Sequence, residues 1–312
     1  MNSPNIIAKV IADSVTFAGH RLTTFEIEYP RFILAELNTH RMLSKNSASS
    51  RAIPIAAMHS YIKANPAEPT HWGKNQPGMQ AHEEVGGSDR SWAQYLWHKA
   101  KDAALQHAQE LADTGVHKQI ANRVTEPWMT MKTVISGTEW ANFYYLRDHP
   151  DAQPEIAELA HKMYLAHKAS TPQELKHGEW HLPYVETRRG VNGELQYISP
   201  VSNHPYTLED AKMVSASCCA QVSYRRQDDS ISKAYKIYDQ LINSKPAHAS
   251  PVEHQATPMP HRFGIGEETR HPFWPPGVTH QDRAGNYWSG NLQGWIQHRK
   301  LIQDEAVWGQ IK

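Results

Sequence analysis

The stretch from His40 to Arg51 has the residue types of a phosphate-binding loop. It reads His40-Arg41-x-x-Ser44-x-Asn46-x-x-Ser49-x-Arg51, so arginines bracket a run of small hydroxyl and amide side chains. The guanidinium group of arginine is a fixed fork of donors that suits phosphate oxygens, and hydroxyls with loop amides can complete the cradle. A serine-rich loop is otherwise usually only solvated surface. The stretch alone therefore leaves both interpretations open.

This stretch resembles the signature of the flavin-dependent thymidylate synthases (the ThyX family), usually written RHRxxSxNxxSxR. The matching positions are His40, Arg41, Ser44, Asn46, Ser49 and Arg51, with Phe25-x-Ile27 and Pro30 in family-like places upstream. A second block is similar to a family helix: Asn142-Phe143-x-x-Leu146-Arg147, then Ala152-Gln153-x-Glu155-Ile156. Arg123 stands four residues before Pro127, as a family arginine does. Two blocks in the right order favour membership of this family.

The resemblance implies a role for each matching residue. Ser49, Arg51 and Arg123 would bind the nucleotide phosphate, and Glu36 would lie beside the base. Arg147 would be the catalytic residue, because its charge would stabilise the negative charge that develops on the pyrimidine as C5 becomes nucleophilic. The positions that would contact FAD are His40, Arg41, Ser47 and Asn142, with Ser250 and Glu253 as possible additions.

The implied reaction is reductive methylation of dUMP to dTMP, with methylenetetrahydrofolate as carbon donor and NADPH as reductant. Family members are homotetramers with shared active sites, so a homo-oligomer is expected, in which His40 and Arg147 could meet across an interface. The protein departs from the family pattern at Thr39 and Thr138, where arginines are expected, and at Ser47, Ala52 and Ser136. A catalytically inactive homologue that binds nucleotide or flavin is therefore an alternative.

Glu36 stands where the family has a glutamine. A carboxylate only accepts hydrogen bonds, whereas an amide both donates and accepts. A carboxylate therefore suits the exocyclic amine of cytosine better than O4 of uracil. This motivates a second hypothesis, in which the substrate is dCMP and the product is methylated or hydroxymethylated at C5.

Two further family-like segments are displaced. Ala220-Gln221-Val222-Ser223-Tyr224 and Ser250-Pro251-Val252-Glu253-His254 resemble segments that precede the arginine motif in the family, whereas here they follow it. The chain is either rearranged like a circular permutant or carries a divergent partial copy. We expect residues 1–165 to form a ThyX-like core and residues 166–312 to pack into the same domain.

Periodicity predicts the elements that position these residues. The fold expected is α/β, with a central twisted antiparallel sheet flanked by helices. Alternating apolar residues predict strands between Ile6 and Tyr29, with a turn at Gly19–His20. Helical spacing predicts helices beginning at Pro30 and over 92–112, 126–147, 155–168, 214–224, 230–243 and 292–303. Residues 65–91 are expected to be a surface excursion, and residues 176–205 loops with a small hairpin.

Composition excludes several classes of function. Lysine plus arginine number 32 and aspartate plus glutamate 32, and this zero net charge argues against a stable nucleic-acid complex. No apolar run approaches the roughly 20 residues of a membrane span. The only cysteines, Cys218 and Cys219, are adjacent, which favours a reducing, cytoplasmic location. His177-x-x-x-His181 has no clear third ligand, so no metal site is expected.

Overall fold

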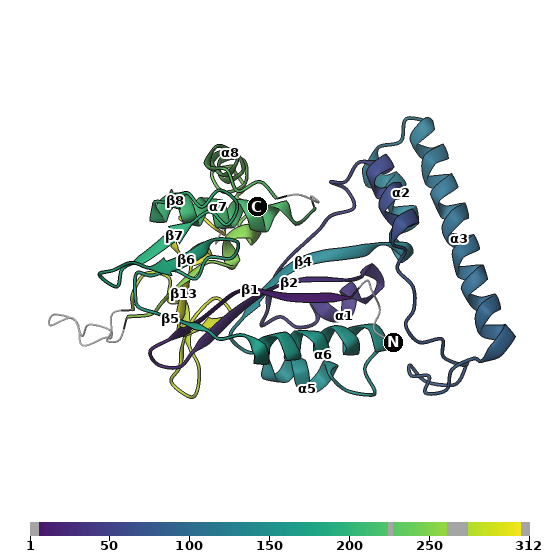
Figure 1. Ribbon diagram of the computed structural model, residues 1–312, viewed down its shortest axis with the longest axis horizontal. Coiled ribbons are helices and arrows are strands. Elements are labelled where there is room, and N and C mark those ends of the chain that lie inside the picture. The colour runs from purple at the N-terminus through teal and green to yellow at the C-terminus, as the bar shows by residue number, and fades with distance from the viewer. Residues whose placement is uncertain (1–5, 224–226, 261–273, 307–312) are drawn as a thin grey trace, which may run out of the picture.

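A five-stranded sheet forms the centre of the protein, in a computed structural model that describes residues 6–223, 227–260 and 274–306. The strand order is β3-β4-β2-β1-β5 (Figure 1). The strands are β1 (Ile7–Thr16), β2 (Arg21–Pro30), β3 (Ser44–Ser47), β4 (Thr130–Gly137) and β5 (Gln173–Leu175). β5 pairs with β1 in parallel, and the other pairs are antiparallel. The expected fold class is confirmed.

The hairpin of β1 and β2 divides the sheet into two unlike faces. Gly19 adopts a φ of 86° in the turn, which glycine tolerates without strain. Phe25, Ile27 and Tyr29 are fully buried on one face, which we call the apolar face. Thr24, Glu26 and Glu28 alternate with them on the other, the polar face. The strand pair predicted from the alternation is confirmed.

Three helices cover the apolar face: α1 (Leu34–Asn38), α5 (Ala141–Arg147) and α6 (Pro154–Ala169), with η1 (Arg31–Ile33) before α1 (Figure 1). Leu37, Phe143 and Leu159 from these helices pack with Phe25 and Ile135 in the main core cluster. Burial of such side chains is the main term that holds helices on a sheet. The helices expected after Pro30 and over 155–168 are confirmed.

The helix expected over 126–147 is wrong. The segment contains the end of η2 (Asn122–Trp128), then β4 and α5. All but one residue of β4 are buried, because both faces of this inner strand are covered. A strand buried on both faces loses the polar–apolar alternation and reads as an apolar run, which periodicity cannot separate from a buried helix.

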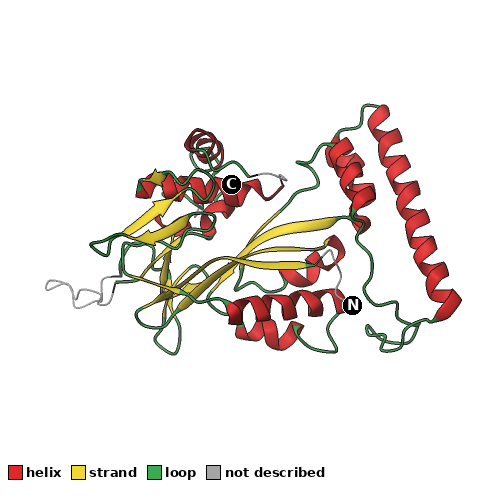
Figure 2. Cartoon of the chain, in the orientation of Figure 1, coloured by secondary structure: helices red, strands yellow, loops and turns green. Residues whose placement is uncertain are grey.

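Two helices form an arm at the end of the sheet (Figures 1 and 2). They are α2 (Ile55–Ala64) and the 27-residue α3 (Gly87–Asp113), followed by α4 (Lys118–Ala121) and η2. Met58 and Ile62 of α2 pack with Leu105 of α3 and Trp128 of η2. The predicted helix over 92–112 is confirmed and begins earlier.

The C-terminal part of the chain packs against the sheet. Its helical elements are α7 (Leu208–Ala220), η3 (Gln221–Ser223), α8 (Ile231–Leu241), η4 (Ser250–Glu253) and η5 (His298–Leu301). Its strands are β6 (Glu186–Arg189), β7 (Leu195–Ile198), β8 (Pro205–Tyr206), β9 (Ala256–Pro258), β10 (His280–Gln281), β11 (Tyr287–Ser289), β12 (Leu292–Gln293) and β13 (Trp295–Gln297). The small hairpin and the helices near 214–224 and 230–243 are confirmed, although Tyr224 lies outside the described residues.

The helix expected over 292–303 is wrong. This segment forms β12, β13 and η5, and β13 pairs with β9. Gly294 has a φ of 74°, outside the helical region, and a Cβ there would approach the His20 ring to 2.3 Å. The glycine allows Trp295 to enter the core fully buried.

Candidate active site

β3 carries the middle of the motif and sends alternate side chains to opposite faces of the sheet. Ser44 pairs with Ser136 and Asn46 with Val134, so both point to the polar face. Lys45 and Ser47 therefore point to the apolar face. The Ser47 hydroxyl accepts a hydrogen bond from Thr133 at 2.8 Å, so this hydroxyl is bonded to a neighbouring strand of the sheet.

The displaced C-terminal segments close over the polar side of β3. The Asn46 amide donates to the carbonyl oxygen of Cys219 at 2.5 Å, and the Ser250 hydroxyl donates to Asn46 Oδ1 at 3.3 Å. The backbone N–H of Ser49 donates to the Ser223 hydroxyl at 2.9 Å. The fold therefore brings both displaced segments to the strand that carries the motif.

On the apolar side, His40 and Arg147 meet within one chain rather than across an interface. Arg147 Nε donates to His40 Nε2 at 2.8 Å, and Arg147 Nη2 donates to the Thr39 hydroxyl at 3.2 Å. The Phe143 ring packs edge-on against the imidazole, with ring centres 4.9 Å apart. Burial, with the charges of Arg147 and Lys45, lowers the pKa of His40 to about 4. The imidazole is therefore neutral near pH 7 and holds the guanidinium as a hydrogen-bond acceptor.

Arg147 and Glu36 line a cavity of about 740 Å³. The opposite wall comes from residues 69–82, including His71, Gln80 and His82. Glu36 Oε2 is buried and has no hydrogen-bond partner among the described residues. A polar oxygen buried without a hydrogen-bond partner is costly unless a ligand supplies a donor.

The segment 65–91 is thus more than the expected surface excursion. Glu155, which is 2% exposed, accepts hydrogen bonds from the backbone N–H of Thr70 at 2.6 Å and from its hydroxyl at 3.1 Å. These bonds hold the segment against α6. Sequence reasoning missed its lining residues, since a Pro-, Gly- and His-rich composition is typical of loops anywhere. The one signal was Glu155 itself, a carboxylate within a helix that packs on the core.

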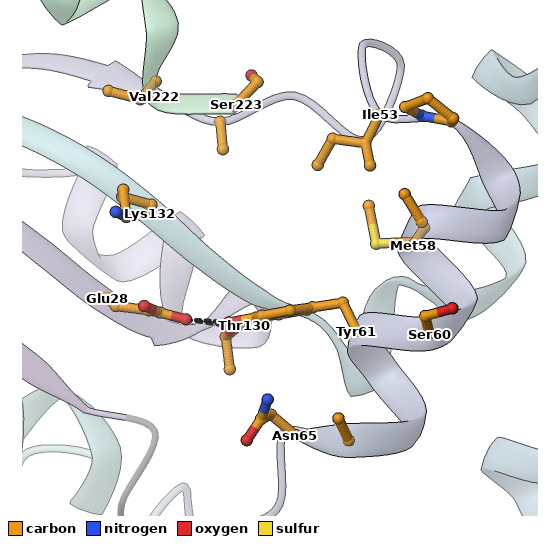
Figure 3. A pocket seen from close by; sticks show the side chains of 14 residues that line it. Glu28, Ile53, Met58, Ser60, Tyr61, Asn65, Thr130, Lys132, Val222 and Ser223 are labelled. Carbon is orange, nitrogen blue, oxygen red and sulfur yellow. Dashed lines mark hydrogen bonds between the residues drawn. The ribbon is translucent and has the colours of Figure 1, made fainter. Parts of the chain in front are cut away.

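A second cavity, of about 550 Å³, lies over the polar face beside residues 48–53, which follow β3 and which we call the serine loop (Figure 3). Ala48 and Ile53 of the loop line it, with Met58 and Tyr61 of α2. Its other lining includes Glu28, Thr130, Lys132, Val222 and Ser223. No sequence pattern distinguishes Glu28 and Lys132, because single charged residues on strands usually face solvent.

The expected phosphate-binding residues lie on and beside the serine loop. Arg51 is exposed, and its side chain has no hydrogen bond to any described residue. Arg123 of η2 forms an ion pair with Glu126 at 3.5 Å, and the same carboxylate oxygen accepts from the Ser50 hydroxyl at 2.9 Å. Neither cavity is lined by both the serine loop and the Glu36–Arg147 pair. One chain therefore does not gather the five expected substrate residues into one cavity.

The residues expected to contact FAD fall into two groups: those with an exposed side chain, and those whose side chain is already bonded to another residue. Arg41 and Asn142 are exposed, next to His40 and Phe143, whose rings touch. An exposed guanidinium and amide are suitable donors for the phosphates and ring of a flavin nucleotide. Ser250 is bonded to Asn46, and Glu253 forms an ion pair with Arg299. The Thr138 hydroxyl accepts from the backbone N–H of Gln293 at 3.1 Å, so β12 occupies the place beside it.

Within the described residues, no group of three or more histidine, cysteine or acidic side chains could hold a metal ion. His181 instead donates to or accepts from Ser14 and Thr24 at 2.9 and 2.8 Å. Both cysteines are free and buried. None of the described helices combines the length and the apolar character that a membrane span requires.

Comparison with known proteins gives a family and a set of similar structures. The sequence model described as "Thymidylate synthase complementing protein" matches residues 5–173. The UMP/dUMP methylase PolB from Streptomyces cacaoi with 5-Br UMP is 19% identical, at a TM-score of 0.42, over 52% of this chain and 87% of that chain. Its complex with 5-Br dUMP gives 20% and 0.41, over 52% and 89%. No curated protein matches the sequence. The family match covers more than half of the chain, so this protein belongs to the thymidylate synthase complementing proteins, the flavin-dependent thymidylate synthase-like methyltransferases.

Proposed function

We propose that this protein transfers a one-carbon unit to C5 of a pyrimidine deoxynucleoside monophosphate, and that the reaction is the reductive methylation of dUMP to dTMP. The methylene carbon of methylenetetrahydrofolate becomes bonded to C5, and the bonds from this carbon to the folate nitrogens break, which releases tetrahydrofolate. The C5 proton leaves, and a hydride equivalent from NADPH reduces the new methylene group to a methyl group. The observation that carries the proposal is the Arg147–His40 pair at the wall of the cavity that also contains Glu36.

Arg147 is the proposed catalytic residue. Neutral His40 accepts from Nε, and Thr39 accepts from Nη2, so the guanidinium plane is held before substrate arrives. A preorganised positive charge stabilises negative charge on the pyrimidine ring without further reorganisation. No protein nucleophile is needed for this chemistry.

FAD, when bound, supplies the redox step. We propose that Arg41 and Asn142 hold it, beside His40. Their exposure supports this role. Support is weaker for Ser47, Ser250 and Glu253, whose side chains are bonded to Thr133, Asn46 and Arg299.

We further propose that the site is completed between subunits of a homo-oligomer, as in the tetramers of the family. Asn46 points to the polar face and leads to the loop of Ser49 and Arg51, while Glu36 and Arg147 lie under the apolar face. A second subunit would join a serine loop, with Arg123 beside it, to a Glu36–Arg147 cavity.

Mixing two inactive variants tests the shared site. Arg51→Ala and Arg147→Ala remove residues from different halves, so hybrids of the two should regain dTMP formation. The matched control mixes Arg147→Ala with Glu36→Ala, which damage the same half and should stay inactive. A hybrid of the first pair that is as inactive as its components would contradict shared sites.

The primary test is the purified protein itself. Its absorption spectrum should contain the flavin bands, and [5-³H]dUMP with methylenetetrahydrofolate and NADPH should release tritium. Absence of flavin together with no thermal shift on adding any pyrimidine monophosphate would overturn the proposal. A yellow protein that releases no tritium would identify an inactive homologue.

The buried, unpartnered Glu36 Oε2 favours a second candidate, C5 methylation or hydroxymethylation of dCMP. The exocyclic amine of cytosine supplies the donor that this oxygen lacks, so dCMP should bind about tenfold more tightly than dUMP. Glu36→Gln should reverse the order, and Glu186→Gln, an exposed control, should not. Turnover of dUMP alone by the wild type would remove this candidate.

A further inference from the structure

The cavity over the polar face has a built floor. Glu28 on β2 and Lys132 on β4 are direct cross-strand partners, so their side chains stand side by side on the same face. Lys132 Nζ pairs with Glu26 at 3.2 Å rather than with Glu28. An acceptor and a donor thus stand next to each other without pairing to each other.

Tyr61 fixes the acceptor. Its hydroxyl donates to Glu28 Oε1 and lies 2.5 Å from the Thr130 hydroxyl, which also donates to Oε1 at 2.8 Å. Figure 3 shows Tyr61 reaching from α2 across to Glu28. Oε2 of Glu28 has no hydrogen bond to any described residue. One carboxylate oxygen is held and the other is available.

The walls of the cavity are mostly apolar. Ile53, Met58 and Val222 face the space above the floor, and Ser223 lies at the edge beside the serine loop (Figure 3). The volume of about 550 Å³ lies within the usual range of small-molecule sites. Mostly apolar walls over a floor with one acceptor and one donor suit a ring with a polar edge better than a sugar or a free phosphate.

We propose that this cavity binds a planar nitrogen heterocycle whose edge carries an N–H beside a C=O, with the N–H donating to Glu28 and the C=O accepting from Lys132. The pterin ring of a folate has this edge. The flavin and uracil rings have it too, but the proposed function places them beside Arg41, Asn142 and Arg147, away from this cavity. The inference deepens the proposed function, on which its choice of ligands rests, because Glu36, Arg147 and His40 belong to the other face and leave this cavity for another ring of the reaction.

Calorimetry with the full-length protein tests the site. The probes are 5-formyltetrahydrofolate, riboflavin and uridine, one for each source of the edge. 5-Formyltetrahydrofolate should bind, and Glu28→Gln should weaken its binding by about tenfold or more, because the amide turns a donor toward the ligand N–H. The variant keeps an oxygen for Tyr61 and Thr130, so the fold should survive.

Two further variants keep the result decisive. Ala57→Phe should fill the cavity from α2 and abolish binding of the same probe, and Glu186→Gln should leave it unchanged. Failure of 5-formyltetrahydrofolate to bind, or binding of it that Glu28→Gln and Ala57→Phe leave intact, would overturn the inference. Tritium release from dUMP by the wild type is measured separately, so failure of the cavity assignment is distinguishable from failure of the proposed function.

Discussion

At the scale of single residues, the pair of His40 and Arg147 decides how the side chain of the proposed catalytic arginine is held. Burial keeps His40 neutral, so its Nε2 accepts from the arginine instead of repelling it. The side chain of Arg147 is thereby fixed in one orientation, which its length would otherwise not ensure. The proposed role of Arg147 therefore depends on the fork of its guanidinium group as well as on its charge.

Arg147→Lys separates the charge from the fork. The lysine keeps the positive charge but cannot reach His40 and Thr39 together, so we expect kcat to fall by about 100-fold. The free energy of unfolding, measured in urea, should change by less than about 1 kcal/mol, because the lost contacts are partly exposed. Arg188→Lys, at an exposed position, is the matched control. Full activity in Arg147→Lys would exclude a role for the fork.

At the scale of elements, β3 is where the two halves of the chain meet. Its Asn46 is hydrogen-bonded to the end of α7 through Cys219 and to η4 through Ser250. Each bond joins residues that are more than 170 positions apart in the sequence. The bonds therefore stabilise the packing of the displaced segments on β3 and do not belong to a local turn.

Asn46→Ala removes both bonds and leaves the Cys219 carbonyl without this donor. We expect the free energy of unfolding to fall by about 1–3 kcal/mol, the cost of an unsatisfied buried group. Asn142→Ala, on an exposed face of α5, should change it by no more than about 0.5 kcal/mol. Equal stability of the two variants in urea titrations would show that β3 does not tie the halves together.

At the scale of the whole molecule, buried histidines link stability to pH. Burial lowers the pKa of both His181 and His254 to about 3, and these rings join Ser14, Thr24 and Ser136 in one hydrogen-bonded chain. In the unfolded chain such rings titrate near pH 6.5. Below that pH the unfolded state takes up protons that the folded state refuses. Stability is therefore complete above about pH 6.5 and is lost as the pH falls toward 3.

The free energy of unfolding should fall by about 1.4 kcal/mol per pH unit for each such histidine between pH 6 and 4. Urea titrations across this range measure the slope. His254→Gln should reduce the slope by the contribution of one proton, and His204→Gln, an exposed control, should leave it unchanged. A stability that is constant from pH 7 to 4 would contradict the prediction.

The sequence by itself determined the family motif, the β1–β2 hairpin, and the helices α3, α6, α7 and α8. These features rest on residue types and periodicities that act over a few turns or strands. β4 was mistaken for a helix because its burial on both faces, a tertiary property, erases alternation. The segment 292–303 was also mistaken for a helix. Gly294 has a positive φ there, and a Cβ at this position would clash with the His20 ring, so packing against His20 requires a glycine in a turn.

Only the tertiary structure decided which candidate residues share a cavity. Strand alternation in β3 sends Asn46 to one face and Lys45 to the other, and this separates the serine loop from Glu36 and Arg147. Residues 69–82 form the wall of the larger cavity opposite Glu36 and Arg147, and the cross-strand pair of Glu28 and Lys132 forms the floor of the smaller one. The motif from His40 to Arg51 indicated the family and its type of chemistry. Strand register and long-range packing, which local sequence does not encode, place the candidate residues on two different faces of one sheet.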